Sequence, residues 1–168
     1  FIPLSAINSG VKDIRDAIDQ AKKQRYFDRP GPILFIDEIH RFSKSQQDSL
    51  LGAVEDGTVT LIGATTENPS FEVISALLSR SQVYVLKPLD EETMRKLIAR
   101  AISQDEELKK KKIIIEEDNA LLQITGGDAR KLLSALEIVT SQDEEPIIIN
   151  DERVKEAIQQ NIAFYDKG

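Results

Sequence analysis

Two adjacent carboxylates, Asp37 and Glu38, directly follow the continuous apolar run of residues 33–36. Such a run is typical of a parallel strand buried on both faces, and ligands of open parallel sheets gather at the carboxyl ends of strands. Because successive side chains of a strand point to opposite faces, the two carboxylates diverge. That arrangement suits two separate tasks: one carboxylate binds a magnesium ion, and the other polarises a water molecule aimed at a phosphate.

An apolar strand that ends in Asp-Glu is the Walker B pattern of nucleoside triphosphatases. The alternative is that Asp37 or Glu38 only caps the turn that follows. The sequence has no cysteine and a single histidine, which excludes thiolate sites and sites of several histidines and leaves carboxylate-bound cations such as Mg²⁺. Two neighbouring acids supply too few ligands for a two-metal nuclease site.

A second group of polar residues follows the β-rich run of residues 58–64. Thr65, Thr66 and Asn68 lie at the tip of that run, where a hydroxyl or an amide can hold the attacking water or a terminal phosphate. Threonine and asparagine are also common turn residues, so this group alone is a weak signal.

Two arginines occupy helix ends. Arg80 ends a predicted helix, where a cation complements the helix dipole, but a guanidinium also stabilises charge in phosphoryl transfer and can come from a neighbouring subunit. Arg130 lies at the start of a predicted helix, where the dipole disfavours a cation. A phosphate partner would explain that placement.

Strands and helices alternate up to residue 86 and must position these side chains. Hydrophobic periodicity predicts strands at residues 1–4, 33–36, 58–64 and 83–86, and helices at residues 10–24, 45–55 and 71–79. This order predicts a parallel sheet with helices on both faces. From Asp90, a predicted N-cap, the chain becomes helical, with further helices at about 117–125, 128–141 and 151–162. The triplets at 113–115 and 147–149 either pair or pack.

The formal charge is −7, which argues against broad nucleic-acid affinity of this stretch alone, because phosphate contacts need clustered Lys and Arg. Local basic clusters occur at Lys22, Lys23 and Arg25 and at residues 109–112. A run of four lysines, as at 109–112, is more often a solvated loop than a binding site. No apolar run is long enough to span a bilayer, so the default expectation is a cytoplasmic protein without membrane contact.

The stretch "ILFIDEIHRFSKSQQDSLLGAVEDGTVTLIGATTENPSFEVISALLSRSQVYVLKPL", together with "GVKDIRDAI" and "GGDARKLLSALE", resembles AAA+ ATPases of the RarA/MgsA family, also called the Werner helicase interacting protein family. These proteins are similar to the Holliday junction motor RuvB and to clamp-loader subunits. The resemblance implies an α/β fold: a partial parallel-sheet AAA+ core over residues 1–89 and a small helical lid domain over residues 90–168.

The resemblance also implies roles for single residues. Asp37 corresponds to the magnesium-binding acid and Glu38 to the acid that activates water. The sensor 1 position falls on Thr65, Thr66 or Asn68: alignment from the strand favours a threonine, alignment back from the arginine favours Asn68, and Thr66 is preferred. His40, in the family string "DEIHRF", is expected to be a packed or polar-interface residue.

The two arginines also have counterparts in the family. Arg80 corresponds to an arginine finger that acts on the nucleotide of the next subunit; its box reads Ser79-Arg80-Ser81 where the clamp-loader pattern has cysteine last. Arg130 corresponds to the sensor 2 arginine, which would contact the terminal phosphate of its own subunit.

No G-x-x-x-x-G-K-[ST] phosphate-binding loop occurs in the sequence. The family places that loop before Phe1, so we expect a piece of a longer protein that binds ATP weakly or not at all by itself. For the parent, the resemblance implies a DNA-dependent ATPase in replication-fork maintenance, recombination and repair. It implies ATP and Mg²⁺ as cofactors, a homo-oligomer, and DNA and replication proteins such as single-strand-binding protein as partners. The alternative is a clamp-loader-like adaptor that does not hydrolyse ATP.

Overall fold

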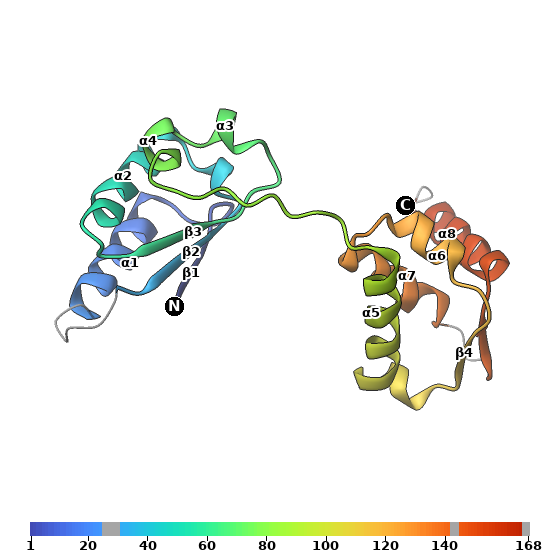
Figure 1. Cartoon of the computed structure of the whole chain (residues 1–168). Helices are drawn as coiled ribbons and strands as arrows, with labels where there is room; N and C mark the ends of the chain where they lie inside the picture. The colour runs from blue at the N-terminus through green and yellow to red at the C-terminus, as the bar shows by residue number, and fades with distance from the viewer. Residues whose placement is uncertain (25–30, 142–144, 166–168) are drawn as a thin grey trace. The chain divides into compact units, whose positions relative to one another are not determined.

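The computed structural model describes residues 1–24, 31–141 and 145–165, with side chains of the last helix up to residue 161 (Figure 1). Contacts divide the chain into two compact units, Phe1–Tyr84 and Val85–Gly168. The sequence predicts the boundary slightly later, between Leu89 and Asp90. Each unit has its own apolar core, so each is described by itself.

The first unit is built on a parallel sheet of three strands, β1 (Ile2–Ser5), β2 (Ile33–Asp37) and β3 (Thr60–Gly63), in the order β1-β2-β3. This confirms the predicted parallel α/β fold. The central strand is β2, with Ser5 of β1 opposite Asp37 and Gly63 of β3 opposite Ile36. All three strands therefore end at the same edge, next to the two acids.

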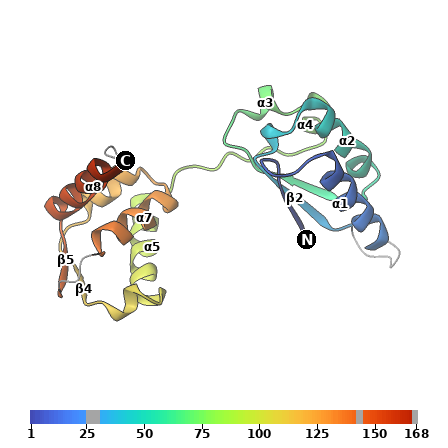
Figure 2. The same cartoon turned by 180° about the vertical axis from the view of Figure 1, so that it is seen from behind.

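One face of the sheet carries helices α1 (Val11–Gln24) and α2 (Lys44–Glu55), which lie on the same side in both views (Figures 1 and 2). Leu34 and Ile36 of β2 are fully buried in one core with Ile14 of α1 and Leu50 of α2.

The opposite face of the sheet lies open in the described part of the chain. Ile33 and Ile62 are 39% and 45% exposed, and Phe35 stacks on the exposed ring of Phe1 at a centroid distance of 6.1 Å. The prediction of helices on both faces is therefore wrong for the residues that the structure describes. The continuous apolar run of β2 indicated two buried faces, but its side chains alternate between covered and open positions.

The predicted helix at residues 71–79 is two short helices, α3 (Pro69–Glu72) and α4 (Ser75–Leu78), separated by extended backbone at Val73 and Ile74. The buried side chain of Gln47 on α2 supplies the reason. Its Nε2 donates to the carbonyl oxygen of Glu72 at 3.0 Å, and its Oε1 accepts from the Ile74 amide at 2.9 Å. These bonds stabilise the break because they satisfy backbone groups that a continuous helix would pair internally.

The predicted strand at residues 83–86 does not form. The backbone there joins neither sheet, and the side chains from Val83 to Leu86 are 53–91% exposed. β-branched and aromatic residues favour strands mainly by fitting a half-buried sheet surface, and this segment has no such surface against it in the described structure.

The second unit consists of helices packed with a two-stranded parallel sheet. Its elements are α5 (Glu91–Gln104), η3 (Leu108–Lys110), β4 (Ile113–Ile115), α6 (Asn119–Thr125), α7 (Ala129–Val139), β5 (Ile147–Ile149) and α8 (Asp151–Tyr165). The predicted helices are confirmed, and the two isoleucine triplets pair with each other. Ile147 and Ile149 are fully buried beside Leu132 and Leu136.

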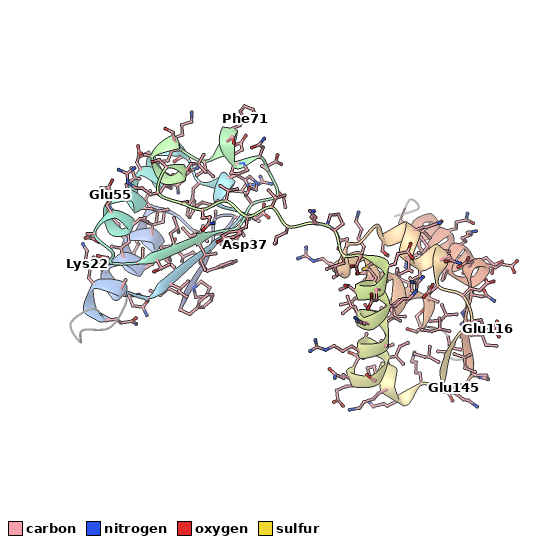
Figure 3. All side chains as sticks on the ribbon, viewed as in Figure 1. Lys22, Asp37, Glu55, Phe71, Glu116 and Glu145 are labelled. Atoms are coloured by element: carbon pink, nitrogen blue, oxygen red, sulfur yellow. The ribbon has the colours of Figure 1, made fainter. Side chains whose placement is uncertain are left out.

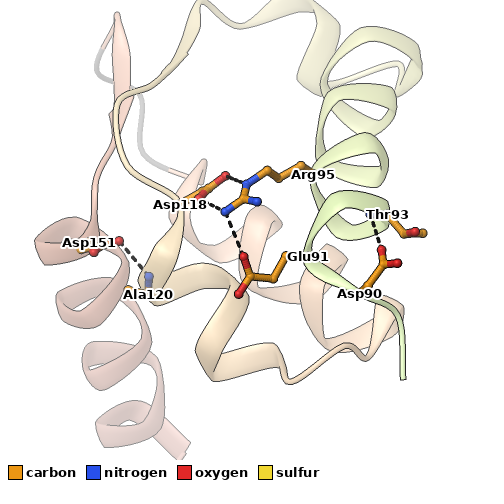
Figure 4. A network of polar contacts seen from close by, with 7 residues as sticks. All are labelled: Asp90, Glu91, Thr93, Arg95, Asp118, Ala120 and Asp151. Carbon is orange, nitrogen blue, oxygen red and sulfur yellow. Dashed lines mark hydrogen bonds and ion pairs between the residues drawn. The ribbon is translucent and has the colours of Figure 1, made fainter. Parts of the chain in front are cut away.

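Acidic side chains fix several backbone ends of the second unit (Figure 4). Asp90 accepts from the Thr93 amide at 2.8 Å, which confirms it as the N-cap of α5, and Asp151 accepts from the Ala120 amide at 2.8 Å. Arg95 pairs with Asp118 through its Nε at 2.8 Å. The hydrogen bond and charge of Asp118 raise the pKa of Arg95.

Three of the four lysines at residues 109–112 have partners among the described residues of the second unit. Lys109 pairs with Glu106 at 2.7 Å, Lys110 pairs with Glu107 at 2.9 Å, and Lys111 donates to the Thr140 carbonyl at 2.6 Å. In the first cluster, Lys22 and Lys23 are exposed on α1, whereas Arg25 lies outside the described residues. Among the described helices, none has the length and apolar character required to cross a bilayer.

Candidate active site

The carboxyl ends of β2 and β3 bring the predicted catalytic residues of the first unit together. The Ala6 amide donates to the Asp37 carbonyl at 2.9 Å and the Ala64 amide donates to the Ile36 carbonyl at 2.9 Å, so the loops after all three strands begin side by side. Asp37 lies at this end of the sheet (Figure 3), with its side chain exposed and its Oδ1 accepting from the Glu38 amide at 3.1 Å. The second carboxylate oxygen, Oδ2, therefore has room for a ligand.

Glu38 has a left-handed backbone conformation, with φ 55° and ψ 42°, and begins the short helix η2 (Ile39–Arg41). Among the described residues it is the one non-glycine residue with positive φ. A side chain in this conformation costs about 1–2 kcal/mol, and such strain concentrates at functional sites. The Ile39 amide donates to the Ala64 carbonyl at 3.0 Å, which fixes the turn against the end of β3.

His40 connects the two loops through its side chain. Its Nδ1 lies 2.8 Å from the hydroxyl oxygen of Thr65, and its Nε2 lies 3.3 Å from a carboxylate oxygen of Glu38. The ring is 10% exposed and the Glu38 side chain 24%. His40 is thus a polar-interface residue, one of the two readings that the sequence allows, and it spans the ends of β2 and β3.

The three candidates for the sensor position have different surroundings. The Thr65 hydroxyl is bonded to His40 and accepts from the Glu67 amide at 3.0 Å. Asn68 is the N-cap of α3, because its Oδ1 accepts from the Ser70 amide at 3.0 Å. The Thr66 side chain is exposed, and its hydroxyl forms no hydrogen bond within the described part of the chain. Thr66 is the candidate whose polar group is open to a ligand.

Arg80 follows α4 and is held by its own unit. Its Nη1 donates to the Ala76 carbonyl at 2.8 Å and to the Ser79 hydroxyl at 3.1 Å, and its Nη2 pairs with Glu55 of α2 at 2.6 Å. Its side chain is 43% exposed. Both uses considered from the sequence fit this geometry: Arg80 caps a helix end, and its guanidinium remains accessible.

Arg130 lies in the first turn of α7 in the second unit, two residues after the N-cap Asp128. Asp128 accepts from the Lys131 amide at 3.0 Å. That bond, assisted by the Arg130 amide and by the charges of Lys131 and Arg130, lowers the pKa of Asp128. The Arg130 side chain is exposed and has no hydrogen bond or ion pair to another described residue. Its guanidinium is free for an anion.

The donor set at the strand ends is small for a metal. No group of three or more Asp, Glu or His side chains close enough to hold a metal ion exists within residues 1–24, 31–141 and 145–161. Magnesium in nucleotide enzymes is commonly bound through one or two carboxylates, the substrate phosphates and water. Asp37, exposed and with one free carboxylate oxygen, fits that pattern.

Sequence reasoning did not identify Gln47 and Glu55 as part of this region. Glu55 is one of many exposed acids, and nothing in the sequence marks it as the partner of Arg80. Gln47 had a readable signal, since it lies three, four and seven positions before Leu50, Leu51 and Val54 on the apolar side of α2. A polar residue on such a face needs buried partners.

Comparison with protein families gives two matches. Residues 4–89 match the ATPase family associated with various cellular activities (AAA), and residues 109–168 match the AAA C-terminal domain. The first of these spans the strand ends that carry Asp37, Glu38 and Thr66, and the second spans Arg130.

Several proteins are similar to the chain over most of its length. The replication-associated recombination protein A of Haemophilus influenzae is 45% identical over 170 residues, covering 98% of this chain and 38% of that protein. The Escherichia coli protein of the same name is 46% identical over 84% of this chain and 32% of its own length. ATPase WRNIP1 of Dictyostelium discoideum is 39% identical over 98% of this chain and 21% of its own length. The chain thus spans well under half of these relatives.

Among solved structures, the RuvB Holliday junction branch migration motor of Thermotoga maritima is similar, with a TM-score of 0.71 and 25% sequence identity. The match covers 94% of this chain and 52% of that protein.

Proposed function

The chain belongs to the AAA family of ATPases, in the group of the replication-associated recombination proteins and WRNIP1, and we propose that its parent protein hydrolyses ATP in DNA replication and recombination. The observation that carries the proposal is the shared edge of β2 and β3, where Asp37, the strained Glu38 and the open hydroxyl of Thr66 lie on adjoining loops. Such an edge is where parallel α/β sheets bind their ligands.

In this proposal Asp37 and Glu38 have different roles. Asp37 supplies a carboxylate oxygen to Mg²⁺, which, when bound, neutralises charge on the phosphates of ATP. Glu38 accepts a hydrogen bond from the attacking water and directs it at the terminal phosphorus. The water oxygen bonds to the terminal phosphorus, and the bond from that phosphorus to the bridging oxygen breaks. ADP and inorganic phosphate leave, and the proton of the water passes to solvent through Glu38. Thr66 donates its hydroxyl to that phosphate or to the water.

The arginines supply positive charge in this proposal. Arg80 is half-exposed after α4 and reaches the nucleotide of a neighbouring subunit, while Arg130 contacts the terminal phosphate of its own subunit. The role of Arg80 needs an oligomer, as in other enzymes that use an arginine supplied in trans. We therefore propose a homo-oligomer.

DNA is the proposed macromolecular partner of the parent. The names of the relatives support this, since they describe proteins of replication, recombination and junction migration. The charge of this sequence does not support DNA binding. The net charge is −7, and three of the four lysines at residues 109–112 contact two glutamates and a backbone carbonyl.

The proposal is tested by ATP hydrolysis, with and without DNA, in a protein that contains this sequence together with a phosphate-binding loop. Turnover that requires Mg²⁺ and rises with DNA supports it; binding without turnover would favour a clamp-loader-like adaptor instead. For the sequence by itself we expect little or no binding of Mg-ATP, because it supplies no loop to wrap the phosphates. Micromolar affinity in a calorimetric titration would contradict that expectation.

A further inference from the structure

His40, the single histidine of the sequence, stands between Glu38, which the proposed function uses, and Thr65, which precedes Thr66 on the loop after β3. It lies on η2, between the Glu38 carboxylate at 3.3 Å and the Thr65 hydroxyl at 2.8 Å. The Thr65 hydroxyl in turn accepts from the Glu67 amide at 3.0 Å. A continuous chain of polar contacts thus runs from the loop after β3 to the loop after β2.

The charge of Glu38 fixes which ring nitrogen carries the hydrogen. A carboxylate oxygen 3.3 Å from Nε2 repels a nitrogen lone pair and attracts an N–H group, so Nε2 carries the hydrogen. In a neutral ring Nδ1 then has none and accepts from the Thr65 hydroxyl. Thr65 satisfies both demands, because its oxygen accepts from the Glu67 amide while its hydrogen points at the ring.

We propose that His40 is a positioning residue that holds the Glu38 carboxylate and the Thr65 loop in one arrangement. This rests on the proposed ATPase function and adds an assignment to it. The bond to His40 occupies the hydroxyl hydrogen of Thr65, so Thr65 cannot also donate it to a phosphate. Thr66, exposed and without a described partner, is left as the hydroxyl that meets the terminal phosphate.

The backbone of this region does not depend on the ring. Two backbone hydrogen bonds stabilise the turn: the Ile39 amide donates to the Ala64 carbonyl at 3.0 Å, and the Arg41 amide donates to the Glu38 carbonyl at 2.8 Å. The buried ring of Phe42 anchors the residues that follow. The contacts of His40 are side chain to side chain. Loss of the ring should therefore release the two side chains while the turn remains.

The first experiment reads the hydrogen bonds directly and needs no enzymatic activity. Because the chain has one histidine, a ¹⁵N-labelled sample gives a single set of ring signals in a long-range ¹H–¹⁵N spectrum. In mildly alkaline solution we expect the Nε2–H tautomer, with Nδ1 shifted as a hydrogen-bond acceptor. Thr65→Val should move the Nδ1 signal toward that of an unbonded nitrogen, whereas Thr66→Val should leave the ring signals unchanged.

An Nδ1–H tautomer, or ring signals that do not shift in the Thr65→Val variant, would overturn the hydrogen-bond assignment. Far-ultraviolet circular dichroism of each variant establishes that the compared proteins share one fold.

The second experiment measures turnover in the parent protein. His40→Ala should lower kcat about tenfold to a hundredfold and leave KM for ATP within about threefold, since misplaced groups lose rate more than binding. His40→Gln can restore the donor to Glu38 and His40→Asn the acceptor for Thr65, so each should recover part of the loss. An equal loss in all three variants, or a change in KM alone, would overturn the positioning role.

The two proposals fail in different ways. If the unaltered parent shows no ATP turnover, the proposed function falls, and the catalytic part of this inference falls with it. The ring spectra then still decide whether His40 joins Glu38 and Thr65. If the parent is active and His40→Ala turns over at the normal rate, only the positioning role of His40 is overturned.

Discussion

The two units of the chain use their carboxylates differently. In the second unit Asp90 accepts from a nearby backbone amide and Asp118 pairs with Arg95 (Figure 4). Asp105 and Asp128 also accept from nearby backbone amides, so these acids hold the fold. At the strand ends of the first unit, the Asp37 carboxylate accepts from the Glu38 amide and has no other hydrogen bond to a described residue, and Glu38 has a strained backbone conformation beside His40. Replacing the acids of the second unit should therefore lower the stability of that unit, whereas replacing Asp37 or Glu38 should lower the proposed ATPase activity.

The largest expected effect is on turnover. Glu38→Gln in the parent should lower kcat by about 10²–10⁴-fold, because an amide polarises water far less than a carboxylate. Binding of Mg-ATP and the unfolding transition should stay close to those of the unaltered protein. Steady-state phosphate release, nucleotide titration and thermal melting measure the three quantities.

Asp48→Asn is the control, since it also replaces one carboxylate of the first unit by an amide, at an exposed position of α2. It should leave turnover unchanged. Equal losses in both variants would show that general charge, not the position of Glu38, governs the rate.

The second prediction places a large stability effect in the second unit. Gly127 has φ +80°, and a Cβ there would lie 2.6 Å from the Leu89 carbonyl oxygen and 2.7 Å from Pro88 Cβ. Gly127→Ala should reduce the free energy of unfolding of this unit by roughly 2–5 kcal/mol, from left-handed strain plus overpacking. Chemical denaturation measures the loss.

Gly126→Ala provides the comparison, because Gly126 has φ +57° but nothing within 4 Å of its added Cβ. Gly126→Ala should reduce the free energy of unfolding by about 1–2 kcal/mol, from the left-handed backbone strain alone. If both variants lose the same amount, the close approach of Pro88 and Leu89 has no energetic weight.

The third prediction concerns acid stability. The pKa of Asp90 is lowered by its hydrogen bonds from Thr93, that of Asp105 by the Leu108 and Glu107 amides, and that of Asp128 by the Lys131 amide. A pKa that is lower in the folded state contributes stability above the unfolded value of about 3.9 and loses it as the pH falls through the folded value. The second unit should lose stability below about pH 4.

Denaturant unfolding between neutral pH and about pH 3, near the unfolded aspartate value, measures this loss. Asp90→Asn combined with Asp128→Asn should flatten the dependence while keeping the caps, since asparagine caps about as well as aspartate. An acid loss of unchanged size in that double variant would show that other groups cause it.

The smallest predicted effect tests the strain at Glu38. Glu38→Gly and Glu38→Ala both remove the carboxylate, but only glycine adopts φ 55° at no steric cost. The glycine variant should be more stable than the alanine variant by about 1 kcal/mol. Equal stability of the two variants would mean that the backbone relaxes out of the left-handed region once the side chain is gone.

Local patterns predicted most elements of both units. The strands β1, β2 and β3 and the helices α1 and α2 lie close to their predicted positions, because alternating or helical spacing of apolar residues reports which face is buried. Asp90 was predicted as a cap because a capping aspartate acts on an amide three residues away, within reach of the local sequence.

Long-range contacts explain the failures. The helix expected at residues 71–79 breaks because Gln47, more than twenty residues earlier in the sequence, bonds to the backbone of Glu72 and Ile74. The run at residues 83–86 has strand-forming residues but pairs with no strand among the described residues. Neither the hydrogen bonds of Gln47 nor the lack of a neighbouring strand can be predicted from the spacing of nearby residues.

The sequence by itself determined that Asp37 and Glu38 lie at the end of an apolar strand, that polar residues follow the next strand, and that the chain resembles AAA+ ATPases. These are properties of residue type and spacing along one segment. Only the tertiary structure decided that Thr65 turns to His40 while Thr66 stays open, that Arg80 is held by Glu55, and that Glu38 is strained. Each of these depends on the parallel pairing of strands or on packing between helices, which brings together side chains that lie far apart in the sequence.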